Sequence, residues 1–310
     1  MNTTTLSPVG HAAPRSIWAT RWQALIHHKP AAIALVVLLL LTVFCFSAPL
    51  YGALMGIDPN ASDLFERYSE PTAKHVLGTD EIGRDVLLRL MYGGQISLAV
   101  GVLATLFGAV IGVAIGVLAG FVGGRTDAFL MRATDCMIAL PLVPLLVVMA
   151  AIDLSKLGVP HDLAQSPMVS FWRIVIIISL VDWTTIARVV RAGTLTVRGQ
   201  DYVLSARVSG GSGLYNILTH VLPNVATPII VASTLTVSRV ILLESTLSFL
   251  GVGVMPPTPT WGNMLNNAQE LATTAPMLAV YPGLLIFMTV IAFNFLGDGL
   301  RVAFDPRSDH

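Results

Sequence analysis

Long stretches of this chain contain no Asp, Glu, Lys or Arg, and these stretches constrain the fold more than any other feature. They cover residues 30–57, 90–124, 136–152, 208–238, 245–269 and 271–297. A helix needs about 20 residues to cross the hydrocarbon core of a bilayer. Only 12% of the 310 residues are charged and the mean hydropathy is +0.74, whereas soluble domains carry about a quarter charged residues. The sequence therefore predicts an all-α membrane protein.

The predicted crossings lie near residues 31–54, 97–121, 130–152, 172–192, 225–250 and 276–297. The fourth is the weakest by hydropathy, because Arg173, Asp182 and Arg188 interrupt it. The third contains Pro141 and Pro144, which a membrane helix tolerates when neighbouring groups satisfy the freed carbonyls. We expect six transmembrane helices and a multi-pass protein in the lipid bilayer.

The basic residues predict the orientation of these crossings. With six crossings, both termini lie on the same side as segments 122–129 and 193–224. Lys and Arg near membrane ends favour the cytoplasm. This side carries Arg15, Arg21, Lys29, Arg125, Arg198, Arg207, Arg301 and Arg307, with Arg188 and Arg191 at its helix boundary. The other side carries Arg67, Lys74, Arg84, Arg89 and Lys156. We therefore expect both termini and the 193–224 loop to be cytoplasmic.

No motif in the chain indicates catalysis or an energy source. A phosphate-binding loop needs G-x-x-x-x-G-K-[ST], but none of Lys29, Lys74 and Lys156 is preceded by Gly or followed by Ser or Thr. Neither H-E-x-x-H nor G-x-S-x-G occurs, and the seven histidines form no metal-binding spacing. The 18 basic residues balance the 18 acidic ones, which argues against a nucleic-acid partner. The chain is expected not to be an enzyme and to hold no cofactor or metal of its own.

The polar, basic segment 198–224 lies between two predicted crossings. Asp201 suits the positive end of a helix, and Ala206 and Arg207 continue that helix. Gly210–Gly211 then breaks it. Glycine also lets backbones approach each other closely.

A second short helix is predicted for residues 214–222. Leu214, Ile217, Leu218, Val221 and Leu222 would share an apolar face, and Pro223–Asn224 would end the helix. Two short helices joined at a glycine hinge can present side chains to a groove on another protein. The alternative is a helical hairpin that lies on the lipid surface.

The spacing in this segment resembles the EAA loop of ABC importer permeases, which docks on the ATPase subunit. That pattern is EAA, three residues, Gly, nine residues, then I-x-L-P. Here the same places hold Leu204-Ser205-Ala206, Gly210, His220 and Leu222-Pro223. Leu204 replaces the leading Glu, so a carboxylate contact with the ATPase is not expected. The residues that the resemblance assigns to docking are Asp201, Tyr202, Ala206, Arg207, Gly210, Gly211, Leu214, Leu222 and Pro223.

The resemblance extends over most of the chain. Segments 77–98 (LGTDEIGRDVLLRLMYGGQISL), 187–203, 247–265 and 292–307 resemble, in the same order, the DppC/OppC-type subunit of dipeptide and oligopeptide importers. This implies the type I ABC importer permease fold, with a core at 94–298. It also implies a cytoplasmic segment at 1–30, a first transmembrane helix with a periplasmic loop at 31–93, and a cytoplasmic tail at 299–310.

The resemblance also implies partners in the bacterial inner membrane. These are a second permease of the DppB/OppB type, two ATPase subunits that bind ATP and Mg, and a periplasmic solute-binding protein. Related permeases serve dipeptides, longer peptides, glutathione, metal chelates or opines, and the sequence does not choose among them.

A compact polar cluster lies before the second predicted crossing, on the predicted outer side. It consists of Gly78, Asp80, Gly83, Arg84 and Asp85. The cluster either orders an outer gate that meets the binding protein, or it is a structural unit in which an acid pairs with Arg84 and caps the helix near residue 86. The two interpretations are compatible.

The segment 256–262 (PPTPTWG) follows the fifth predicted crossing. Prolines this dense, Pro257 among them, exclude a helix and make a stiff outer loop. With Trp261 this loop is a candidate part of the outer gate, and a short helix is expected at 263–272. The alternative is simple stiffening of the loop.

Arg239 and Glu244 fall inside the fifth predicted crossing. Ionisable groups at that depth are costly and mark either a pathway or a partner. The two could meet the two ends of a zwitterionic peptide, or they could form structural ion pairs between helices. Asp182 with Arg188, and Asp135 with Arg132, are expected to form pairs near helix ends.

Two functions compete with ATP-driven import. The first is a proton-coupled secondary transporter that uses Glu244 or Asp182. The second is a membrane scaffold whose loop recruits a soluble partner without transport. The 198–224 segment has no role in the first.

Overall fold

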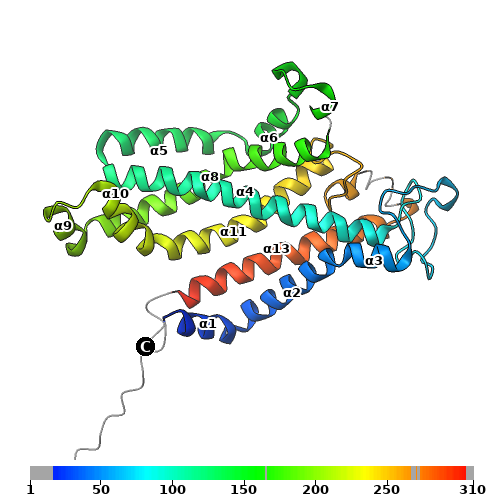
Figure 1. The fold of residues 1–310 in the computed structure, drawn as a ribbon, viewed down its shortest axis with the longest axis horizontal. Coiled ribbons are helices and arrows are strands. Elements are labelled where there is room, and N and C mark those ends of the chain that lie inside the picture. The colour runs from blue at the N-terminus through cyan, green and yellow to red at the C-terminus, as the bar shows by residue number, and fades with distance from the viewer. Residues whose placement is uncertain (1–16, 165, 267–269, 271–272, 305–310) are drawn as a thin grey trace, which may run out of the picture.

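The computed structural model describes residues 17–164, 166–266, 270 and 273–304. These residues form helices, turns and loops, with one isolated bridge between Thr79 and Asp85. The long helices run side by side as an elongated bundle (Figure 1). The all-α membrane fold is confirmed.

Most predicted crossings appear as long helices, several of them longer than expected. They are α2 (Lys29–Phe46) followed by α3 (Ala48–Met55), α4 (Val86–Val122), α8 (Pro167–Arg198), α11 (Leu222–Phe249) and α13 (Met277–Ala303). Within the described residues, four helices are long and apolar enough to span a membrane. They are Lys29–Phe46, Val86–Val122, Gly213–Phe249 and Met277–Ala303. α8 is not among them.

The third predicted crossing is not one straight helix. α5 (Gly124–Ala139) and α6 (Leu142–Ala150) are bent by 86° relative to each other. Leu140 is extended, at φ −75° and ψ 139°, because the ring of Pro141 disfavours helical backbone in the preceding residue. The pair counts as a fifth span only if it crosses as a broken helix, so the count of six crossings is not confirmed.

Glycines bring α4 and α8 into close contact over much of their lengths. A Cβ added at Gly112 would lie 2.7 Å from the carbonyl oxygen of Trp183, and one at Gly116 would lie 2.5 Å from that of Ala187. Small residues spaced four apart allow helix backbones to approach in this way. This contact fixes the position of α8 although its sequence is the least apolar of the long helices.

The two ends of the bundle differ in what they carry. At one end, α1 (Ile17–His27) packs against the last turns of α13, and the short helix α9 (Asp201–Val208) lies at this same end (Figure 1). The opposite end carries the loop with η1 (Leu64–Glu66) and the turn η4 (Asn263–Leu265). The helix predicted at 263–272 begins with η4, but most of its remainder lies outside the described residues.

η2 (Leu154–Leu157) and α7 (His161–Ala164) connect α6 to the start of α8, also away from α9 (Figure 1). The grouping of segments by membrane side made from the sequence therefore agrees with the two ends of the bundle.

Candidate functional site

The first helix of the docking segment forms where the sequence predicts it. α9 begins at Asp201 and ends before Gly210, which has φ +85°. Gly210 donates its N–H to the carbonyl of Arg207, and Gly211 donates to that of Ala206, both at 3.0 Å. A glycine in the left-handed region is a common way to end a helix. Gly210 allows the chain to turn sharply here, since a residue with a Cβ would be strained in this conformation.

The second helix does not end at Pro223, contrary to the prediction. α10 (Gly213–Asn216) leads into a π-helical stretch, Ile217–Val221, which continues directly into α11. In a regular helix the ring of Pro223 would clash with the carbonyl four residues earlier. A π turn widens the backbone at this point, so the proline is accommodated and the docking segment is joined without a break to a long helix.

The predicted apolar face of the second helix divides into two parts. Val221 is fully buried, and Ile217 packs against a buried cluster of α4 and α8. Leu214 and Leu218 are exposed, Leu214 to 67%. Val208, at the end of α9, is 89% exposed. The docking segment thus leaves apolar side chains uncovered at the tip of the bundle.

His220 joins the two halves of the docking segment, which the sequence did not predict. Its ring lies 5.9 Å from that of Tyr202 on α9 and 5.9 Å from that of Tyr215 on α10, in edge-on contacts. Edge-to-face pairs of rings are favourable. A histidine flanked by two tyrosines at separations of 18 and five residues gives no local pattern by which it could be found.

Two arginines attach the docking segment to the end of α4. Arg198 donates through Nη1 to the carbonyls of Gly120 and Phe121, at 3.1 and 3.0 Å. The guanidinium of Arg207 lies 4.3 Å from the centre of the Phe121 ring. Since the last carbonyls of a helix lack partners within it, Arg198 caps α4. Two basic residues of this loop, Arg198 and Arg207, therefore attach it to the end of α4.

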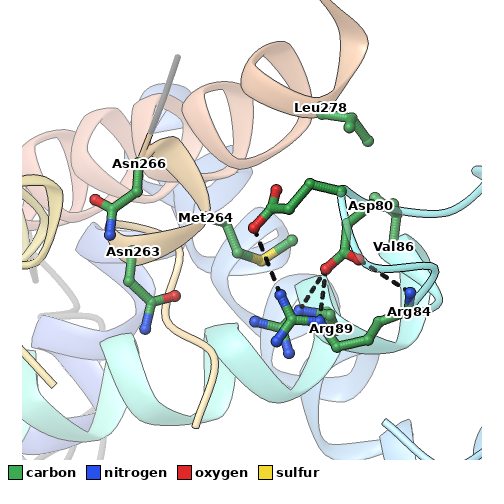
Figure 2. Close-up of a pocket in the computed structure, with 9 residues that line it drawn as sticks. Asp80, Arg84, Val86, Arg89, Asn263, Met264, Asn266 and Leu278 are labelled. Carbon is green, nitrogen blue, oxygen red and sulfur yellow. Dashed lines mark hydrogen bonds and ion pairs between the residues drawn. The ribbon is translucent and has the colours of Figure 1, made fainter. Parts of the chain in front are cut away.

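At the other end of the bundle, Asp80 lies between two arginines (Figure 2). It accepts from Arg84 Nε at 2.7 Å and from the backbone N–H of Ile82 and of Arg84, and Arg89 Nε is 3.5 Å away. Asp80 and both arginines line a cavity of about 40 Å³ together with Asn263, which has room for one or two water molecules. The cavity joins the cluster to the loop after α11.

Asp85 caps α4, as the structural interpretation of the cluster predicts. It accepts from the backbone N–H of Leu88 at 2.6 Å and from His75 Nδ1 at 2.9 Å, and it is buried. Gly78 and Gly83 have φ of +77° and +80°. A Cβ at Gly83 would overlap the backbone of Asp63, so both glycines are required by the turns of this loop.

Trp261 fastens the outer loop onto the bundle. Its side chain is fully buried, and its Nε1 donates to the carbonyl of Leu90 at 2.9 Å. It packs on Gly94, where a Cβ would lie 2.6 Å from the indole ring. Pro257, four residues earlier, is exposed and follows a cis peptide bond.

Glu244 is fully buried beneath this loop. It accepts hydrogen bonds from Ser97 on α4 at 3.1 Å and from Ser248 on α11 at 2.8 Å. Ser97 in turn accepts the backbone N–H of Trp261 at 3.2 Å. The carboxyl group therefore links α4, α11 and the outer loop, which enclose it.

Arg239 is separated from Glu244 and faces a different surface. It pairs with Asp182 of α8, whose side chain is 2% exposed, while 45% of the Arg239 side chain remains accessible. It lines a hollow of about 410 Å³ between α5, α6, α8 and α11, which Arg188 also lines. The structure thus does not bring Arg239 and Glu244 into one site.

The two ion pairs predicted near helix ends are wrong. Arg188 pairs with Asp135 at 2.5 Å, and Asp182 pairs with Arg239. Asp182 and Arg188 are six residues apart on one helix, so they point in different directions. The actual pairs join neighbouring helices instead.

Comparison with known proteins decides the family. A family described as "binding-protein-dependent transport system inner membrane component" matches residues 112–310. A second, described as the N-terminal TM domain of oligopeptide transport permease C, matches residues 16–70. This chain is a permease of the binding-protein-dependent ABC importer family.

Curated relatives agree with this assignment. The permease is 39% identical over 274 residues to a putative peptide permease protein of Brucella suis, across 88% of this chain and 86% of that protein. It is 37% identical over 297 residues to the glutathione transport system permease protein GsiD of Escherichia coli, across 94% and 91% of the two chains.

The resemblance and the function read from the sequence are therefore confirmed at this level. The permease is a multi-pass membrane subunit of an ABC transporter, a complex that includes ATPase and binding-protein partners.

Proposed function

We propose that this permease moves peptides or similar small solutes inward across the bacterial inner membrane by alternating access. It acts in a complex with a second, homologous permease, two ATPase subunits that bind ATP and Mg, and a periplasmic solute-binding protein. The names of its relatives, a peptide permease and a glutathione permease, support this class of solute.

The end of the bundle that carries α9 faces the cytoplasm in this proposal. The larger number of Lys and Arg residues on the segments of this end supports the orientation. α1 and the last turns of α13 lie at the same end, so both termini would be cytoplasmic.

The exposed apolar surface of the docking segment carries the proposal. Val208, Leu214 and Leu218 are uncovered, yet the backbone beneath them is held by Arg198 and runs directly into α11. Moving an equilibrium from 1:99 to 99:1 takes about 5.5 kcal/mol of differential binding. Because the docking segment is continuous with α11, a movement of a bound ATPase subunit would be passed directly to that transmembrane helix.

The other candidate residues have proposed roles in the pathway. The cluster around Asp80 and Asp85, with Trp261, would order the outer gate next to the binding protein. Arg239, with half of its side chain open to a hollow, would form part of the pathway wall. Glu244 would hold the gate loop rather than touch solute, because it is enclosed.

Replacing Leu214 with Asp tests the docking role. The side chain is exposed, so the permease should still fold and insert, whereas co-purification with the ATPase subunits and ATP-driven uptake in proteoliposomes should both be lost. The matched control is Phe65→Asp, at a fully exposed apolar residue of the opposite end, which should leave ATPase association intact. Normal ATPase association and uptake in the Leu214 variant would refute the docking role.

A further inference from the structure

Two adjoining hollows at the outer end of α8 share one arginine. The first, about 360 Å³, is lined by apolar side chains of α6 and α8, including Met149, Trp172 and Ile176. The second, about 300 Å³ and called the polar hollow below, has the polar side chains of Asp153 and His161 among mostly apolar lining residues. Arg173, in the second turn of α8, lines both hollows. Together they form an amphipathic groove.

Arg173 has no counter-ion among the described residues. Its Nε is buried without a hydrogen-bond partner. Arg188, Arg191 and Arg239, farther along the bundle, each pair with an aspartate. A guanidinium that loses water without gaining a partner is costly, so an unpaired one that borders a hollow points to an anionic ligand.

The polar hollow also contains a negative charge. Hydrogen bonds from the side chain and backbone of Ser155 lower the pKa of Asp153, so this carboxyl group is ionised at neutral pH. Both bonds are accepted by Oδ1, which leaves Oδ2 for another donor. A ligand that suits both Asp153 and Arg173 carries a positive group and a negative group a short distance apart.

The apolar hollow continues along the outer surface of α8. Trp172, Ile176 and Leu180 are exposed and follow one another at intervals of four residues, which places them on one face of the helix. Eight residues of helix correspond to about 12 Å. Phe107 of α4, also exposed, lies beside Trp172 with ring centroids 6.2 Å apart. The apolar strip therefore runs from the polar hollow toward the middle of the bundle.

We propose that this groove binds a phospholipid whose headgroup joins a phosphate to a primary ammonium, as in phosphatidylethanolamine. The phosphate pairs with Arg173, the ammonium is received by Asp153, and one acyl chain lies along Trp172, Ile176 and Leu180. Aromatic residues favour the region between headgroups and hydrocarbon, where Trp172 would then lie. The bound lipid would fasten the loop after α6 to the start of α8.

The shape of the groove favours a lipid over a solute. A small zwitterion would fill the polar hollow and the adjoining apolar hollow, but it would not reach the apolar strip that continues to Leu180. A phospholipid uses the whole length. A purely anionic lipid would match Arg173 but would place its negative headgroup beside the carboxylate of Asp153 in the same hollow.

The test measures lipid retained by the assembled transporter. The complex is purified, exchanged into nanodiscs that contain equal parts of phosphatidylethanolamine, phosphatidylcholine and phosphatidylglycerol, and then released for native mass spectrometry. The wild-type complex should retain phosphatidylethanolamine at least about tenfold more than the other two, a difference of about 1.4 kcal/mol. Because this measurement needs no variant, equal retention of the three lipids would overturn the proposal even if the variants failed to assemble.

Variants then assign the two charges. Arg173→Gln should abolish the retention, and Asp153→Asn should remove the preference for the primary ammonium over the trimethylammonium of phosphatidylcholine. The matched control is Lys74→Gln, which removes an exposed cation of the loop before α4 that lines neither hollow and should change nothing. Unchanged retention in Arg173→Gln would overturn the proposal. Displacement of the lipid by a short apolar peptide at micromolar concentration would also overturn it, since the groove would then be a solute site.

Discussion

The cluster around Trp261 at the outer end of this permease is closed within the chain, whereas the docking end leaves apolar side chains uncovered. Trp261, Asp85 and Glu244 are buried, and each has hydrogen-bond partners within the chain. Val208 and Leu214, at the other end, expose apolar surface to the surroundings. Contiguous apolar surface outside the bilayer is a mark of an interaction site. Substitutions in the buried cluster of the outer end should therefore act on the fold, and those at the docking end should act on association.

The largest expected effect is at the outer end. Trp261→Ala should lower the free energy of unfolding by about 3–5 kcal/mol, because a fully buried indole is lost and its cavity does not close. Thermal denaturation of the purified permease in detergent measures the change. Trp22→Ala, at a tryptophan of α1 that is 54% exposed, is the control and should shift the midpoint little. If both variants lowered the denaturation midpoint equally, the buried cluster around Trp261 would not be more important for stability than an exposed residue of α1.

A smaller loss is expected at Glu244. Glu244→Ala leaves the buried hydroxyl group of Ser97 without its acceptor, which costs about 1–3 kcal/mol, whereas Ser248 can donate to a carbonyl of its own helix. Glu244→Gln keeps an acceptor oxygen and should lose less. The same denaturation assay distinguishes this structural role from a role in proton coupling. If Glu244→Gln folds normally yet loses all ATP-driven uptake, the carboxyl group has a function in transport that the structure does not explain.

The local features of the molecule were predictable from the sequence. Charge-free runs located most of the long helices, because a bilayer excludes charge along about 20 residues. The cap by Asp85 was predictable since a cap and the N–H that it accepts lie within three residues. α9 and its ending at Gly210 followed from the same short-range rules.

Features that depend on neighbouring helices were not predictable. The bend at Pro141 depends on whether the surroundings can satisfy a straight helix, and the sequence does not show those surroundings. Asp182 and Arg239 are 57 residues apart, and their pairing depends on how α8 and α11 are rotated against each other. The same is true of Arg198, whose acceptors on α4 lie nearly 80 positions earlier in the chain.

At the docking end, the turn at Gly210 should be important for association with the ATPase subunits. Gly210→Ala introduces a Cβ at φ +85°, where an L residue costs about 1–2 kcal/mol. Open space surrounds the position, so the strain comes from the backbone alone. We expect roughly tenfold weaker ATPase association, with a fall of only a few degrees in the unfolding midpoint. Gly199→Ala, at a glycine with φ −81° and no close neighbours, is the control, and an equal loss there would contradict the argument.

The sharpest form of the comparison is a substitution that changes association without changing stability. Val208 is 89% exposed, so Val208→Asp and Val208→Leu should both leave the free energy of unfolding within about 0.5 kcal/mol of the wild type. Only the Asp variant should lose binding to the ATPase subunits, measured by co-purification or by surface-immobilised titration, because it places a charge where an apolar contact is expected. Should both variants bind alike, the exposed apolar side chains of α9 would not be the contact. Docking would then rest on the polar edge formed by Tyr202, Tyr215 and His220.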